Sequence, residues 1–127
     1  MFDKVMSWLE SDAEGQEDVQ TAVAALYYHM IAVDGQMMRS EVDQFAHLLK
    51  TRFDLDDDQL EALSVKGIEA SNQSPGLFPF TVILKRDLDR DQQQHVLEAL
   101  RQLADADGAR HELETRMIND ITELLGS

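Results

Sequence analysis

The 127-residue chain contains no cysteine, so it has neither a disulfide framework nor a thiolate metal site. No stretch approaches the roughly 18 consecutive apolar residues that a membrane-spanning helix needs. The first ten residues lack the basic and long apolar segments of a secretion signal. We therefore expect a single cytoplasmic domain with no transmembrane segment, which agrees with the length of the chain.

Basic residues are also scarce. The chain has 11 lysines and arginines against 25 aspartates and glutamates, and its formal net charge is −14. Phosphate backbones and anionic membrane surfaces repel such a chain, so we expect no nucleic-acid binding. The same charge attracts metal ions and basic protein surfaces, and it also favours solubility.

The motifs of common enzymes are missing as well. The sequence has no Gly-x-Ser-x-Gly segment, no glycine-rich phosphate loop and no His-Glu-x-x-His segment. No histidine follows a glutamate by three residues, which excludes the di-iron pattern of ferritin-like bundles. The histidines concerned are His29, His47, His95 and His111. We expect that the protein is not an enzyme.

What the sequence does contain is helical periodicity. Apolar residues recur at intervals of three and four along seven segments, which predicts about seven helices and no strand. The segments are 2–9, 16–33, 40–51, 57–70, 77–88, 90–105 and 112–125. The predicted fold class is all-α, a single-domain helical bundle with an N-terminal amphipathic arm at 1–15 and a helical domain at 16–127.

Capping residues mark several of the expected helix starts. Ser40 is predicted to cap the helix that begins there. Two tetrapeptides, 56–59 and 89–92, fit the capping box because each begins with aspartate and ends with glutamine. The expected buried faces of the third and last helices are Val42, Phe45, Ala46 and Leu49, and Leu113, Met117, Ile121, Leu124 and Leu125.

Two segments share one pattern, in which an apolar helix runs into Asp-Gly and the next helix carries an acid in its first turn. Asp34-Gly35 is followed by Glu41, and Asp107-Gly108 by Glu114, at the same interval. Glycine past a helix end is the usual left-handed residue. An aspartate at a helix C-terminus, however, costs about 0.3–1 kcal/mol unless a cation, a basic side chain or backbone N–H groups compensate.

These two Asp-Gly corners do not form EF-hands. With the glycine at the sixth loop position, the first position falls on Leu103 or Met30, which cannot bind calcium. A weaker calcium or magnesium site arises if the corners meet and pool their oxygen ligands. Its candidate ligands are Asp34, Glu41, Asp107 and Glu114, with Asp105, His111 and Glu112 as additional ones. The alternative is that the acids are purely structural.

The N-terminal arm offers a candidate partner-binding surface. The residues concerned are Phe2, Val5, Trp8 and Leu9. Most of them share one helical face, while Trp8 lies beside it. Two interpretations stay open: the arm packs on the core, or it docks a membrane or a protein partner. A homodimer is also compatible with the sequence.

The segments 32–41, 52–55, 77–81 and 104–126 resemble the TerB-like family, named for tellurite-resistance proteins and similar to the non-J-domain part of the co-chaperone DjlA. The similarity extends over about residues 17–126. It implies an all-helical bundle with an internal pseudo-repeat, a bacterial cytoplasmic location, a link to stress responses and an acidic surface that binds metal.

Transferred to this chain, the acidic positions of the family fall on Asp34, Glu41, Asp107 and Glu114. Arg110 departs from the aliphatic residue that is usual there and can itself neutralise a neighbouring acid. Two functions are therefore expected: a non-catalytic, divalent-cation-binding stress module, or an interaction scaffold similar to a co-chaperone.

Overall fold

The computed structural model describes residues 13–33, 38–74, 76–105 and 112–126. Within these ranges the chain forms six helices and no strand, so the all-α prediction is confirmed. The helices are α2 (Ala13–Ala32), α3 (Arg39–Phe53), α4 (Asp57–Gln73), α5 (Phe78–Asp87), α6 (Arg90–Ala104) and α7 (Glu112–Gly126). The helix expected at 2–9 lies outside the described residues.

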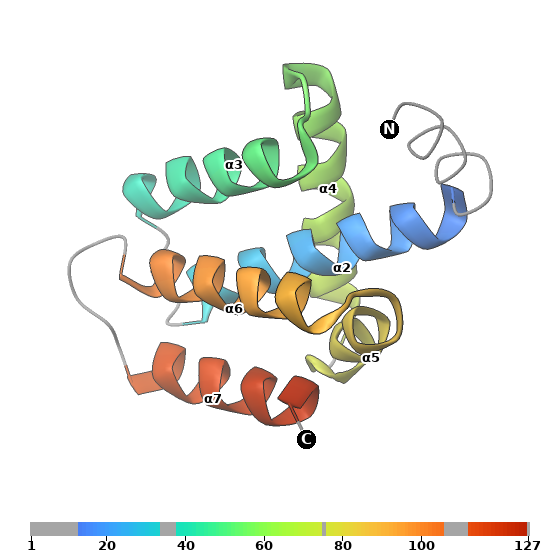
Figure 1. Ribbon diagram of the computed structural model, residues 1–127. Coiled ribbons are helices and arrows are strands. Elements are labelled where there is room, and N and C mark those ends of the chain that lie inside the picture. Colours follow the sequence, from blue (N-terminus) through green and yellow to red (C-terminus); the bar gives the residue numbers. More distant parts are fainter. Residues whose placement is uncertain (1–12, 34–37, 75, 106–111, 127) are drawn as a thin grey trace.

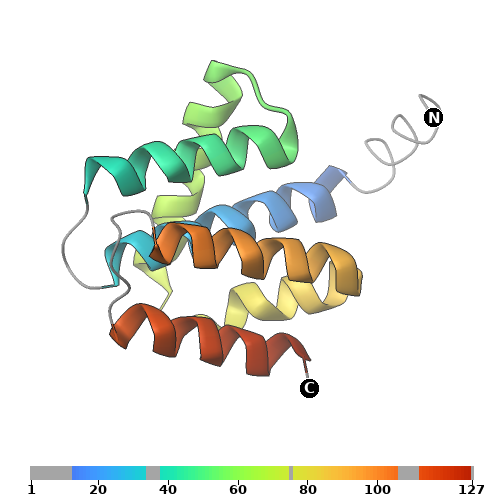
Figure 2. The same cartoon turned by 60° about the vertical axis from the view of Figure 1, so that its left-hand side comes forward.

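Helix α2 is the centre of the bundle, because α3, α4, α5 and α6 all contact it (Figure 1). Its sequence is almost entirely apolar from Ala22 to Ile31, and nearly all of these side chains are buried. A helix that is apolar on most of its surface must be covered by neighbours on several sides. Helix α6 separates α3 from α7 and contacts both (Figures 1 and 2).

Small residues bring α2 and α4 close together. A Cβ atom added to Gly67 of α4 would lie 2.5 Å from the Cβ of Ala24 on α2. Glycine therefore permits a helix contact that no larger residue allows without a backbone shift.

None of the described helices is long and apolar enough to cross a bilayer.

Local capping explains several helix starts. Asp56 and Gln59 exchange hydrogen bonds at the start of α4, and Asp89 and Gln92 do so at the start of α6. Each pair satisfies two backbone N–H groups that a helix start leaves open. Both predicted capping boxes are confirmed.

Three predictions about the helices after the Asp-Gly corners are wrong. Helix α3 begins at Arg39 with Met38 as its cap, so Ser40 is its second residue and not the cap. Val42 and Leu113 are 40% and 48% exposed instead of buried. In α3 the residue before Val42, Glu41, faces inward, because it lies one turn before the buried Phe45. In α7 the residue after Leu113, Glu114, faces inward, because it lies one turn before the buried Ile118.

Candidate functional site

The helix ends that flank the two Asp-Gly segments lie at the same end of the bundle. The C-terminal ends of α2 and α6 and the N-terminal ends of α3 and α7 lie together on the left in both views (Figures 1 and 2). The aspartates of the Asp-Gly pairs, Asp34 and Asp107, are outside the described residues, as is His111. What the structure describes at this end is the first turn of each following helix.

The third residue of α3 and of α7 is a glutamate, and both glutamates are buried. Glu41 and Glu114 are each 1% exposed. The Oε1 atom of Glu41 accepts a hydrogen bond of 2.9 Å from the backbone N–H of Met38. Glu114 also has an interaction partner, so neither glutamate is an unpaired buried charge. The positive end of the helix dipole further reduces the cost of burying a carboxylate there.

The additional acids predicted at the second corner are not buried with them. Asp105 is the exposed residue that ends α6, and its backbone N–H donates to the carbonyl of Arg101 at 3.1 Å. Glu112 is the exposed first residue of α7. Within the described ranges, no group of three or more histidine, aspartate or glutamate side chains is placed to hold a metal ion.

The same helical position differs elsewhere in the bundle. The third residue of α4 is Gln59 and that of α6 is Gln92, and both are exposed. Their amide oxygens accept the same backbone hydrogen bond as Glu41, at 2.9 Å. A neutral amide is therefore sufficient for capping, and the corners carry a charge that this hydrogen bond does not require.

A family model described as tellurite resistance protein TerB matches residues 20–127. The chain belongs to the TerB family. The match includes both corners and all of α3 to α7. Searches of curated proteins and of solved structures each gave no match.

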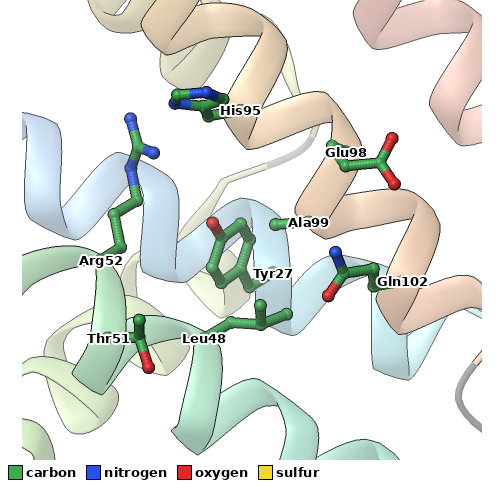
Figure 3. A pocket seen from close by; sticks show the side chains of 8 residues that line it. All are labelled: Tyr27, Leu48, Thr51, Arg52, His95, Glu98, Ala99 and Gln102. Carbon is green, nitrogen blue, oxygen red and sulfur yellow. The ribbon is translucent and has the colours of Figure 1, made fainter.

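Sequence reasoning missed a second site of this TerB-family chain. A cavity of about 290 Å³ lies among α2, α3 and α6, with Tyr27 and Arg52 in its wall (Figure 3). Three of its α6 residues, His95, Ala99 and Gln102, share one helix face by their spacing. This spacing can be recognised in the sequence. It does not show that Tyr27 from α2 and Arg52 from α3 lie against the same face of α6.

The predicted partner-binding residues of the N-terminal arm, Phe2, Val5, Trp8 and Leu9, lie outside the described residues.

Proposed function

We propose that this TerB-family chain is a non-catalytic module that binds a divalent cation at its paired Asp-Gly corners. The supporting observation is the burial of Glu41 and Glu114 at the same helical position and at the same end of the bundle. Burying a carboxylate is costly, and the exposed glutamines of α4 and α6 show that capping does not require it.

The chemistry of the candidate ligands suits a hard cation. Calcium and magnesium bind oxygen ligands, and the four principal candidates are all carboxylates. In the described part of the chain, Glu41 and Glu114 would supply one carboxylate from each corner. Asp34 would join Glu41, and Asp107 would join Glu114. Because α6 lies between α3 and α7, each corner would hold its own cation, which would fix the start of its helix against the end of the helix before it.

The test is a calorimetric melt of chelator-stripped protein with and without calcium, magnesium, zinc or manganese. A cation that binds only the folded state, at a hundredfold excess over its Kd, stabilises it by about 2.7 kcal/mol, or several degrees in Tm. Glu41→Gln and Glu114→Gln should each abolish the part of the shift that comes from its own corner, because glutamine keeps the capping acceptor but removes the charge.

Gln92→Glu is the matched control, since it adds a carboxylate at the same helical position outside the corners. It should leave the shift unchanged. The proposal fails if no ion raises the Tm of the wild-type protein, or if both Glu→Gln variants respond to the ion as the wild type does.

A second candidate is an interaction module in which the acids are purely structural. The capping hydrogen bond of Glu41 gives its burial a structural reason. Phe78 is 64% exposed on α5 and lines, with Val82 and Leu124, a cavity of about 390 Å³ against α7. Val82, one turn further along α5, is also exposed, at 41%, and a contiguous apolar patch on a surface is typical of a protein contact.

Sedimentation velocity over a range of protein concentrations tests this candidate as a homodimer. Phe78→Asp should abolish concentration-dependent association, whereas Val65→Asp, a change at a 49% exposed valine on α4, should not. A wild-type protein that stays monomeric at every concentration would exclude a homodimer through this surface.

A further inference from the structure

Three hydrogen-bond donors converge on the cavity among α2, α3 and α6. They are the hydroxyl of Tyr27, the guanidinium of Arg52 and the imidazole of His95 (Figure 3). In this view the Tyr27 hydroxyl points toward the side on which Arg52 and His95 lie. Each donor comes from a different helix, so the bundle assembles the group only on folding.

Arg52 lacks an acidic partner in a chain that is rich in acids. The sequence has more than twice as many carboxylates as basic side chains, 25 against 11. Yet in the described ranges no carboxylate lies within ion-pair distance of Arg52. One terminal nitrogen donates to the carbonyl of Gln92 at a long 3.4 Å, and the buried Nε atom has no acceptor. A buried donor without an acceptor is costly.

The second donor at the cavity is the hydroxyl of Tyr27. Its side chain is among the largest in the core and is 1% exposed, yet its hydroxyl has no hydrogen-bond partner among the described residues. Buried tyrosines usually find one. Burial raises the pKa of Tyr27 to about 12, although the nearby charge of Arg52 acts in the opposite direction. The hydroxyl is therefore protonated at neutral pH and is available as a donor.

The other residues that line the cavity restrict the size, polarity and charge of a ligand. Leu48 and Ala99 provide an apolar surface beside the donors. Glu98 lines the cavity on the side away from Arg52 and His95 in Figure 3. Its carboxylate lies 3.5 Å from a terminal nitrogen of Arg101, which offsets part of its charge, so Glu98 only weakly disfavours a second negative charge on the ligand. The volume, about 290 Å³, is at the lower end of small-molecule sites.

We propose that this cavity is a binding site for a small organic monocarboxylate. The carboxylate accepts hydrogen bonds from Arg52 and Tyr27, and the apolar body of the ligand lies against Leu48 and Ala99. An arginine suits this role because its planar group binds a carboxylate through two parallel hydrogen bonds. His95 lies where it can donate a further one.

This site is separate from the Asp-Gly corners, because it is built from different residues and takes a ligand of opposite charge. The two proposals can therefore fail independently. Loss of cation binding in the corner variants leaves the carboxylate site untouched, and the reverse also holds.

The test is a nuclear magnetic resonance titration of ¹⁵N-labelled protein with benzoate. Benzamide is the matched neutral probe, since it has nearly the same shape without the charge. Benzoate should shift the side-chain Nε–H signal of Arg52 and the backbone amides around Tyr27 and His95 along one saturable curve. Benzamide should not. The proposal is overturned if the two probes give equal shifts, or if benzoate does not saturate these signals.

Variants sharpen the assignment. Arg52→Gln should weaken benzoate binding about tenfold or more, since a charge-assisted pair is lost. Tyr27→Phe should weaken it several-fold while preserving the packing of the ring. Glu98→Gln should tighten it slightly, because a negative charge that Arg101 only partly offsets is removed. Arg116→Gln, an exposed arginine on α7, is the control and should have no effect.

Phosphate serves as the last probe. With its second negative charge and no apolar body, it should bind more weakly than benzoate. If phosphate shifts the Arg52 signal at lower concentration than benzoate does, the site selects charge alone and the monocarboxylate proposal is wrong.

Discussion

The first turns of α3 and α7 carry a buried glutamate at the position where the first turns of α4 and α6 carry an exposed glutamine. At Glu41, Gln59 and Gln92 the side-chain oxygen accepts a backbone N–H at 2.9 Å, so the local hydrogen bond is the same. The difference lies in burial and in charge. A glutamine amide oxygen therefore accepts the capping hydrogen bond as well as a glutamate carboxylate does.

The third helical position is therefore buried and acidic in α3 and α7, and exposed and neutral in α4 and α6. A buried carboxylate needs compensation by hydrogen bonds, by a helix dipole or by a cation. An exposed glutamine needs none of these. Substitutions at the two kinds of helix start should therefore differ in size, in sensitivity to metal and in dependence on salt and pH.

The largest expected effect is at the buried glutamates. Glu41→Ala should lower the free energy of unfolding by about 2–4 kcal/mol, because it leaves the Met38 N–H without its acceptor and opens a cavity. Glu114→Ala should cost a similar amount. Urea denaturation measures both. A loss below about 1 kcal/mol would place these residues in the same class as the exposed caps.

Removing the exposed caps should have an intermediate effect. Asp56→Ala and Asp89→Ala each delete a side-chain acceptor of a backbone N–H bond, at 2.8 Å in both cases. The expected loss is about 1 kcal/mol for each, since water can replace the missing acceptor at an exposed helix start. Urea denaturation of the two variants beside Glu41→Ala compares the classes directly. Equal losses in all variants would remove the distinction.

Placing the charge on the exposed starts should have a small effect of the opposite sign. Gln59→Glu and Gln92→Glu should stabilise the fold by about 0.3–1 kcal/mol, because a negative charge at a helix N-terminus interacts favourably with the dipole. The gain should shrink as salt is added, since both positions are exposed. Thermal melts at low and high ionic strength provide the measurement. A gain independent of salt would contradict this explanation.

The smallest effect concerns the ion pair beside the start of α4. Lys50 Nζ lies 2.9 Å from Oδ1 of Asp57, and this hydrogen bond lowers the pKa of Asp57. A carboxyl with a lowered folded-state pKa adds stability above its unfolded pKa, about 3.9, and loses it as the pH falls through the folded value. The expected contribution is slight because both side chains are well exposed.

Melting curves from neutral to acidic pH test that pair. Lys50→Gln should lower the Tm slightly at neutral pH, and the difference from the wild type should vanish below the folded pKa of Asp57. A difference that grows toward acidic pH would have the wrong sign for this pair.

Much of the secondary structure could be predicted because its causes are local. The spacing of apolar residues predicts α2 to α7, and Asp56 with Gln59 marks the start of α4. Pro79 lies in the first turn of α5, where its missing N–H costs nothing. The family resemblance was likewise carried by short local segments and is confirmed by the match over residues 20–127.

The wrong predictions concern first turns of helices, where the sequence pattern allows either of two neighbouring residues to face the core. Hydrophobicity favoured Val42 and Leu113 as buried residues, but the fold buries the neighbouring glutamates instead. Successive residues on a helix differ by about 100° in direction, so the apolar stripe alone defines the inward face poorly in a first turn. Packing against the rest of the bundle decides it.

By itself, the sequence determined the helices, the two capping boxes, the negative net charge and the repeat of the Asp-Gly pattern, since each can be read from composition or from residues within a few positions of one another. Only the tertiary structure decided that Glu41 and Glu114 are buried at one end, and that Tyr27, Arg52 and His95 surround one cavity. Those arrangements join residues from separate helices, and they exist only once α2 is covered by its neighbours.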